Sequence, residues 1–425
     1  MSHFQVLVVG GGNAGISAAS KLLLQNKSLS IGIIEPSDKH YYQPAWTLVG
    51  GGTFDIDATE REEASVMPEK ATWIKDKAAT FQPEENTVTC ASGDKYTYDY
   101  LIVAPGIQLD FDKVKGLKET LGKNGVTTNY TLQHAPYTYE CLENFPKGGT
   151  AIFTSPNTPV KCGGAPMKAL YLSSDYFRKK GVLKDSTVHF FSGGTIIFGV
   201  KKYAETLKKV VARYGIKTHF YHNLIEIDGP NKVAYFDKYD TEGNIVDRVE
   251  QKFDMIHVVP PQSAPDFLKD SPLAVPLDPS VPLIDRDGNP CVPSALPPEA
   301  QYFGFVDVDK HSLQHNRYPN IFALGDAANL PTAKTGAAVR KQMPVLVANL
   351  LDHMNGKTPS ASYTGYSSCP LITGYGKIVM AEFDYDSQPM ETFPFNQAQE
   401  RYSMWLLKKY VLPFLYWTRI LKGTM

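Results

Sequence analysis

Two cysteines, 207 positions apart, are the residues of this chain best suited to redox chemistry. Cys162 lies in Pro-Val-Lys-Cys-Gly-Gly-Ala-Pro (159–166), and Cys369 lies in Tyr-Ser-Ser-Cys-Pro-Leu (366–371). A lysine precedes Cys162, a helix is expected to follow it, and Lys168 lies one to two turns along. Cationic neighbours and a helix N-terminus lower the pKa of a thiol, so this pattern predicts a nucleophile. The alternative is a structural thiol in a glycine-rich turn, and Cys369 has no comparable local charge.

The other three cysteines are expected to be bystanders. Cys90 closes a strand-like run and Cys141 lies in a helical stretch, and both contexts are typical of small buried hydrophobic residues. Cys291 lies in residues 271–300, a loop or lid with eight prolines and no core pattern, where we expect an incidental thiol. Five cysteines in 425 residues do not make a disulfide framework.

A dinucleotide site is predicted at the N-terminus. Residues 4–9 form a short apolar run typical of a buried parallel strand, and a glycine turn leads from it into a helical stretch at 16–24. A second strand, 30–34, ends at an acid that would bind a ribose hydroxyl. The residues of this fingerprint are Gly10, Gly12, Gly15 and Glu35.

A later glycine turn indicates that the dinucleotide is FAD. An apolar strand within residues 318–328 delivers Gly325 and Asp326, and this aspartate would accept hydrogen bonds from a ribityl hydroxyl. Thr335 and Gly336 open a helix whose N-terminus could face the flavin ring. The aromatic loop at 40–46, which includes Pro44, is expected to cover part of the cofactor, with core packing as the alternative.

A second doubly wound unit is expected between residues 151 and 221, with helices at 167–180 and 201–214. Its glycine turn, 192–199, lacks the G-x-G-x-x-G spacing and carries bulky Ile and Phe side chains where backbone must approach phosphate. We therefore predict that NAD(P)H does not bind here.

The predicted fold class is α/β, with two Rossmann-like dinucleotide-binding domains and a C-terminal membrane-associating segment. The expected boundaries are 1–118 and 302–356 for a discontinuous FAD-binding domain, 119–301 for the second domain, and 357–425 for the C-terminal region. A net charge of −1 offers no basic excess for nucleic acid. The histidine pairs at 219/222 and 311/315 have no third ligand at a sensible spacing, so we predict no metal site.

The last 21 residues suggest a route for electrons into a membrane. Residues 405–425 combine two tryptophans and many apolar residues with four Lys or Arg and no acid, which is typical of a helix pair lying in the interface. No run of eighteen uncharged apolar residues exists, so a spanning helix is excluded. Docking of this tail on its own core, or on a second subunit of a homo-oligomer, is the alternative. The candidate walls of a quinone site are Phe393, Phe395, Tyr410 and Phe414.

The segments around both cysteines, with Gly325-Asp326 and Asn329-Leu-Pro-Thr332, resemble the sulfide:quinone oxidoreductases of the mitochondrial and related bacterial type. This likeness extends over nearly the whole chain and places it in the two-dinucleotide-fold flavoprotein superfamily. It implies that Cys162 and Cys369 form a disulfide or trisulfide on one face of FAD, and that Lys168 and Lys408 lie near them.

The resemblance also implies a reaction and its partners. Sulfide would attack the bridge and leave a sulfane sulfur on Cys369, the Cys162 thiolate would pass electrons into FAD, and ubiquinone or menaquinone would remove them. A small thiol or sulfite would accept the sulfur. We expect peripheral attachment to a bacterial cytoplasmic membrane, because the chain enters a strand at once and leaves no room for a targeting segment. If a presequence precedes residue 1, the expected membrane is the mitochondrial inner membrane.

Three other functions were compared with this one. An NADH:quinone oxidoreductase is disfavoured by the altered second glycine turn, and a flavocytochrome-type sulfide dehydrogenase is disfavoured by the lipophilic tail. In the third, a non-enzymatic flavoprotein, the cysteines would merely lock a conformation that binds a partner.

Overall fold

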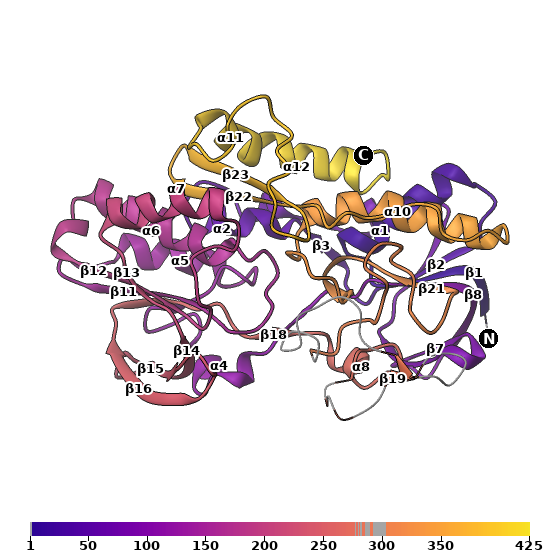
Figure 1. The fold of residues 1–425 in the computed structure, drawn as a ribbon, viewed down its shortest axis with the longest axis horizontal. Coiled ribbons are helices and arrows are strands. Elements are labelled where there is room, and N and C mark those ends of the chain that lie inside the picture. The colour runs from indigo at the N-terminus through magenta and orange to yellow at the C-terminus, as the bar shows by residue number, and fades with distance from the viewer. Residues whose placement is uncertain (1, 277, 279, 281–282, 285–289, 292–302) are drawn as a thin grey trace.

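The computed structural model describes residues 2–276, 278, 280, 283–284, 290–291 and 303–425. Two open sheets lie side by side, and the C-terminal helices run above both of them (Figure 1). The expectations for the proline-rich stretch, including the incidental role of Cys291, fall mostly outside the described residues.

The first sheet is built around a parallel core. Its strands are β1 (Ser2–Val9), β2 (Ile31–Ile34), β5 (Ala71–Ile74), β6 (Ala78–Gln82), β7 (Thr87–Cys90), β8 (Lys95–Val103) and β21 (Ile321–Ala323), and the order is β5-β2-β1-β8-β7-β6 with β21 also on β8. All four residues of β2 are buried, as a parallel strand covered on both faces requires. The chain returns here as the sequence predicted, since β21 pairs in parallel with β8.

The second sheet is parallel throughout. Its order is β10 (Val126–Thr127), β17 (Met255–His257), β11 (Thr150–Ser155), β12 (Thr187–Ser192) and β13 (Lys217–His219). Helix α6 (Ala165–Lys180) begins two residues before the expected start, with Pro166 in its first turn, where a missing N–H costs nothing. An antiparallel meander, β14 (His222–Asp228), β15 (Val233–Tyr239) and β16 (Ile245–Lys252), was not predicted.

A hairpin connects the sheets with the tail. Strands β22 (Ser367–Gly374) and β23 (Lys377–Phe383) run beneath the C-terminal helices (Figure 1). Helix α10 (Gly336–Met354) precedes the hairpin and packs against α1 (Asn13–Gln25).

The tail is one continuous helical run rather than the predicted helix pair. It comprises α11 (Tyr402–Leu406), the π-helical turn η7 (Leu407–Val411), α12 (Leu412–Leu415) and a second π-helical turn, η8 (Tyr416–Ile420). Pro413 has no N–H to donate, which accounts for a widened turn before it. Within the described part of the chain, no helix combines the length and apolarity needed to cross a membrane.

Candidate redox and cofactor site

The N-terminal glycine turn has the geometry of a dinucleotide cradle. Gly10 has φ +103°, and a Cβ there would lie 2.4 Å from the carbonyl oxygen of Ala104. A Cβ on Gly15 would lie 1.9 Å from the carbonyl oxygen of Gly10, so only glycine permits this contact between helix and turn. A Cβ on Gly12 would meet open space, and no side chain caps α1. The helix N–H groups therefore remain available to a pyrophosphate.

Glu35 lies beside this turn, as predicted. Its Oε2 accepts the N–H of Gly11 at 2.7 Å, and its Oε1 accepts the N–H of Ser37 at 2.8 Å. Burial raises the pKa of Glu35, while these two backbone N–H groups oppose the rise. Each carboxylate oxygen keeps a second lone pair, so the side chain can still accept ribose hydroxyls.

The glycine turn at Gly325 completes a site that fits FAD. Gly325 has φ +73°, and Asp326 follows it at the end of β21. Burial raises the pKa of Asp326, and the ammonium groups of Lys334 and Lys161 oppose this rise. Both amide atoms of Asn329 are buried without a partner among the described residues. An unpaired amide in such a turn fits a bound cofactor that supplies its partners.

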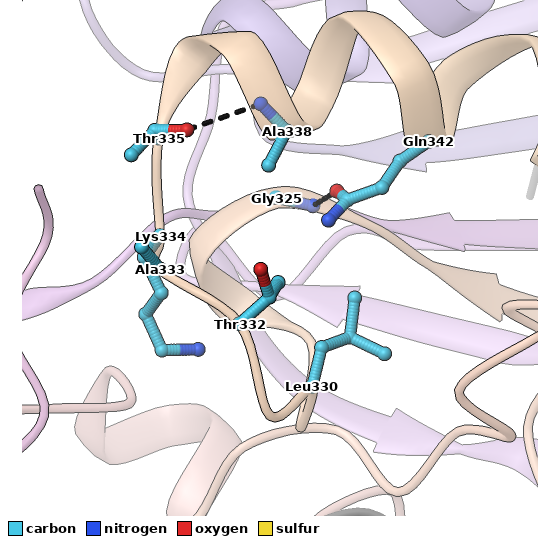
Figure 2. Close-up of a pocket in the computed structure, with 8 residues that line it drawn as sticks. All are labelled: Gly325, Leu330, Thr332, Ala333, Lys334, Thr335, Ala338 and Gln342. Atoms are coloured by element: carbon cyan, nitrogen blue, oxygen red, sulfur yellow. Dashed lines mark hydrogen bonds between the residues drawn. The ribbon is translucent and has the colours of Figure 1, made fainter. Parts of the chain in front are cut away.

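Helix α10 begins directly against this turn (Figure 2). Thr335 accepts the N–H of Ala338 at 3.1 Å, and the N–H of Gly325 donates to Gln342 Oε1 at 2.8 Å. Gly336 is the first residue of the helix, as the sequence indicated. A small pocket here is lined by Gly325, Leu330, Thr332, Ala333, Lys334, Thr335, Ala338 and Gln342.

The fold brings the two cysteines together. Cys162 lies before α6 and Cys369 lies on β22, and the two thiols are near enough for each to shift the pKa of the other. A Cβ on Gly164 would lie 3.7 Å from Cys369 Sγ. Both residues are free thiols in this structure, as are Cys90 and Cys141. The structure thus describes the reduced pair, and the bridged form stays a prediction.

The two sulfurs have opposite proton affinities. The hydrogen bond from Cys369 lowers the pKa of Cys162 well below its ordinary value, and Lys168 and then Lys408 lower it further against the effect of burial. Lys168 Nζ donates to Cys162 Sγ at 2.9 Å. The same contact with Cys162, together with burial, raises the pKa of Cys369 well above its ordinary value. Of the two thiols, Cys162 is therefore the one that favours the thiolate form, and Cys369 is the one that favours keeping its proton.

Lys408 reaches the pair from the tail. Its ammonium group donates to the carbonyl oxygen of Pro44 at 2.8 Å, which ties the tail to the aromatic loop. Burial and the neighbouring Lys168 lower the pKa of Lys408 to about 7. Burial also acts to lower the pKa of Lys168, but the sulfurs of Cys162 and Cys369 raise it above its usual value. The two lysines implied by the family resemblance thus lie close to the cysteines and have different proton affinities.

One expected charge does not act as predicted. Lys161 precedes Cys162, but its ammonium group donates to Gln43 Oε1 at 2.7 Å and lies 5.8 Å from the Trp46 ring centroid. The hydrogen bond to the sulfur comes instead from Lys168. Adjacent residues point in different directions because Cys162 adopts a left-handed conformation, φ +54°.

Tyr130 belongs to the site and was not predicted. It is 5% exposed, its hydroxyl donates to the carbonyl oxygen of Lys161 at 3.3 Å, and burial followed by Cys162 and Cys369 raises its pKa. Nothing near Tyr130 in the sequence distinguishes it from the other 23 tyrosines. Lys334 was also not predicted, because its contact with the Cys162 segment depends on the fold.

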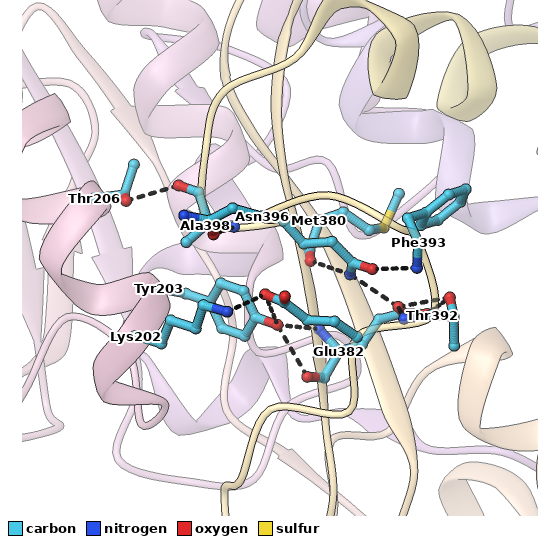
Figure 3. A network of polar contacts seen from close by, with 11 residues as sticks. Lys202, Tyr203, Thr206, Met380, Glu382, Thr392, Phe393, Asn396 and Ala398 are labelled. Carbon is cyan, nitrogen blue, oxygen red and sulfur yellow. Dashed lines mark hydrogen bonds and ion pairs between the residues drawn. The ribbon is translucent and has the colours of Figure 1, made fainter.

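The four candidate quinone residues separate into two places. Phe393 and Phe395 stack with ring centroids 5.3 Å apart and pack against a buried cluster containing Trp405. The surrounding loop is held by polar contacts to Met380 and Glu382 of β23 (Figure 3). Tyr410 and Phe414 are instead 58% and 62% exposed. Tyr410 and Phe414 therefore do not form one site with Phe393 and Phe395.

The histidine pairs have other partners. His219 Nε2 lies 2.9 Å from His189 Nδ1, His222 Nδ1 donates to the carbonyl oxygen of Phe220, and His315 Nε2 donates to that of Leu273. No three His, Cys, Asp or Glu side chains within the described residues are grouped to hold a metal. In the second glycine turn, Ile196 is 60% exposed, and the absence of NAD(P)H there stays a prediction.

Known proteins resemble this chain along its whole length. The family model described as pyridine nucleotide-disulphide oxidoreductase matches residues 4–138. The mitochondrial sulfide:quinone oxidoreductase of Dictyostelium discoideum is 46% identical, over 99% of this chain and 86% of that protein. The mitochondrial sulfide:quinone oxidoreductase of Mus musculus is 42% identical, over 99% of this chain and 87% of that protein. The solved sulfide:quinone oxidoreductase of Aquifex aeolicus has a TM-score of 0.75 at 20% identity, over 100% of this chain and 92% of that one, and shows the fold alone. Because two relatives match almost the full sequence at such identity, the chain belongs to the sulfide:quinone oxidoreductase family.

Proposed function

We propose that this protein oxidises sulfide at the Cys162 and Cys369 pair and passes the electrons to a membrane quinone. The observation that carries this proposal is the Lys168 ammonium 2.9 Å from Cys162 Sγ, in a pair whose two thiols have opposite pKa shifts. FAD would be held by the glycine turns at Gly10–Gly15 and at Gly325, and would supply a two-electron acceptor when bound. The residues described below do the remaining work.

The unequal thiols select which sulfur is attacked. In thiol–disulfide exchange the thiol of lower pKa leaves faster, and here that is Cys162. Hydrosulfide would therefore attack the sulfur of Cys369 in the bridged pair, and the S–S bond would break towards Cys162. The products are a persulfide on Cys369 and a thiolate on Cys162, so two sulfur–sulfur electrons are redistributed and none are lost. Lys168 is positioned to hold this thiolate.

Removal of the sulfane sulfur would return the pair to its starting state. A small thiol or sulfite, as the family resemblance implied, attacks the outer sulfur of the Cys369 persulfide. This transfer would release a thiolate on Cys369. The two cysteine thiolates would then form the bridge again with the loss of two electrons, for which FAD would be the acceptor when bound. Phe393 and Phe395 are the candidate walls for the quinone, supported by their contact with the cluster beneath the tail.

We also propose that the tail lies on a membrane surface. Its outer side carries five exposed apolar or aromatic side chains at helical spacing, while its inner side packs on the protein. The exposed residues are Tyr402, Leu406, Tyr410, Val411 and Phe414. The two relatives named above are mitochondrial proteins, so we place this surface on a mitochondrial membrane.

Replacement of Cys162 tests the reaction. In Cys162→Ser, anaerobic sulfide should no longer bleach the flavin absorbance, because no thiolate can pass electrons into the ring. Cys141→Ser, a buried thiol in α5 (Ala135–Glu143), is the matched control and should bleach normally. Undiminished bleaching in Cys162→Ser would refute the proposal. Bleaching by NADH instead of sulfide would favour an NADH:quinone oxidoreductase.

A further inference from the structure

Lys334 takes no part in the reaction above, yet its ammonium group is fixed inside the site. Only 8% of the residue is exposed, and its Nζ donates to the carbonyl oxygens of Asp326 at 2.8 Å and Ala328 at 2.9 Å. The same Nζ lies 3.7 Å from the centroid of the Phe305 ring. The side chain therefore connects the Lys334 segment to the turn at Asp326–Ala328 through two hydrogen bonds.

The backbone of Lys334 holds the nucleophile. Its carbonyl oxygen accepts the N–H of Cys162 at 2.7 Å, and the two segments form a short parallel bridge through Lys161. Cys162 is in the left-handed region, φ +54°, which residues with a Cβ rarely adopt without support. Its carbonyl oxygen accepts the N–H of Ala165 at 2.7 Å. The hydrogen bonds on both sides of Cys162 thus maintain the conformation that turns its sulfur to Lys168.

The next residue reaches the other cysteine strand. The hydroxyl of Thr335 lies 2.9 Å from Ser367 Oγ, two positions before Cys369 on β22, and also caps α10. Figure 2 shows Lys334 and Thr335 on the segment that enters this helix beside the Gly325 turn. One dipeptide therefore touches the cofactor turn and both cysteine segments.

We infer that Lys334 is a positioning residue for Cys162, tying the nucleophile to the Asp326 turn through its ammonium group and its carbonyl oxygen. This inference rests on the proposed function for the role of Cys162. Without the ammonium anchor, the Lys334 carbonyl is free to move, Cys162 can relax from its left-handed conformation, and its sulfur leaves Lys168. Lys334 thus acts through Cys162 and not on sulfide.

Hydrogen exchange in the holoenzyme tests the anchor directly. In Lys334→Met, the amide of Cys162 should exchange about tenfold faster than in the wild type, because its acceptor is no longer fixed. Mass spectrometry of peptides spanning 159–166 resolves this change. Loss of a nearby charge alone would not accelerate exchange at this amide. Unchanged exchange would overturn the inference.

The pH profile of Cys162 alkylation provides the second readout. After anaerobic reduction, the midpoint for reaction with iodoacetamide should rise in Lys334→Met, because the thiolate loses its contact with Lys168. Lys334→Arg keeps the donors and should restore both readouts towards the wild type. Lys310→Met is a matched control, since Lys310 likewise lies over an aromatic ring, that of Tyr385, with its Nζ 5.5 Å from the ring centroid. It should change neither readout.

The outcomes separate this inference from the proposed function. If the wild type is not bleached by sulfide but Lys334→Met accelerates exchange at Cys162, the reaction is wrong and the anchor is right. If sulfide bleaches the wild type, but Lys334→Met changes neither the exchange rate of the Cys162 amide nor the midpoint of alkylation, the proposed function stands and the role of Lys334 is refuted. Lys334→Gln, which is smaller and polar, is measured in the same way if Lys334→Met does not bind FAD.

Discussion

Four lysines lie around the cysteine pair and the cofactor turn: Lys161, Lys168, Lys334 and Lys408. Their side chains differ in pKa. Burial lowers the pKa of Lys161 and Lys334 to about 8 and that of Lys408 to about 7. Lys168 is the exception, since the sulfurs raise its pKa despite burial. Lys168 is therefore the cation that remains with the thiolate, whereas the charge on Lys408 changes near neutral pH.

Lys408 should weaken the fold as pH falls. Its pKa is about 7 in the folded protein, and an unfolded lysine has a pKa near 10.4, so between these values the unfolded chain binds more protons. The free energy of unfolding of the wild type should therefore fall relative to Lys408→Met as pH decreases from about 10 to about 7. The change should reach several kcal/mol, since one pKa unit corresponds to about 1.4 kcal/mol.

Urea denaturation of holoenzyme at several pH values between 7 and 10 measures this difference. Lys409→Met, which removes the neighbouring charge from the same helical turn, is the control and should differ from the wild type by a nearly constant amount. A pH-independent difference for Lys408→Met would show that Lys408 is not held in a buried, charge-disfavouring position.

At the scale of elements, the hairpin that carries Cys369 depends on a buried carboxylate (Figure 3). Glu382 on β23 is 4% exposed and pairs across the hairpin with the neighbour of Cys369. Its Oε2 accepts the N–H of Thr392 and the amide of Gln397, each at 2.8 Å, and its Oε1 accepts the hydroxyl of Tyr366. One side chain thus joins the hairpin to the loop of Phe393.

Glu382→Leu should destabilise this region strongly. It would leave two buried donors, the Tyr366 hydroxyl and the Gln397 amide, without this acceptor, and each unpaired buried polar group costs about 1–3 kcal/mol. We expect a loss of at least about 2 kcal/mol in the free energy of unfolding, with faster hydrogen exchange in β22 and β23. Glu391→Gln, which breaks only the ion pair with Lys202, should cost under about 1 kcal/mol. Equal effects of the two changes would refute this role.

The elements that the sequence predicted well are those whose signal is local. The N-terminal strand, glycine turn, helix and acid lie within 35 residues, and their geometry follows from Gly10 and Gly15 having no Cβ. Cys162 likewise carried its own signal, because a lysine one to two turns along the same helix does reach its sulfur.

The parts that the sequence could not predict depend on contacts between distant segments. Tyr130 joins the site only because separate loops converge there, and no residue near it in the chain marks this. Lys334 directly precedes Thr335, which the sequence did mark, but its contact with Cys162 exists only because two distant segments meet. Tyr410 and Phe414 carry the apolar character expected of a quinone wall, but which side of a helix faces inward is set by docking. Here Lys408 and Tyr416 take the inner side.

In the whole molecule, the tail has one face that packs on the protein and one face that is exposed. Inward, Tyr416 hydrogen-bonds His40 Nε2 at 2.7 Å, the carbonyl oxygen of Leu421 accepts the hydroxyl of Ser20 at 2.7 Å, and Lys408 enters the cysteine site. The alternative named from the sequence, docking of the tail on its own core, is thus correct for this face. The outward face, which includes Tyr410 and Phe414, remains exposed.

The two faces should therefore be separable by mutation. In Tyr410→Glu/Phe414→Glu, bleaching by sulfide should keep its wild-type rate, because the inner face and the cysteines are untouched. Binding to liposomes should fall at least about tenfold, since each large apolar side chain contributes about 1.5–3 kcal/mol when buried. Reoxidation by a long-chain quinone in those liposomes should slow, while reoxidation by a short-chain soluble quinone should not.

Ile245→Glu/Val246→Glu, on the exposed edge strand β16, is the control. Wild-type liposome binding by the tail variant would rule out this face as the membrane contact, and slower bleaching would show that the two faces are coupled.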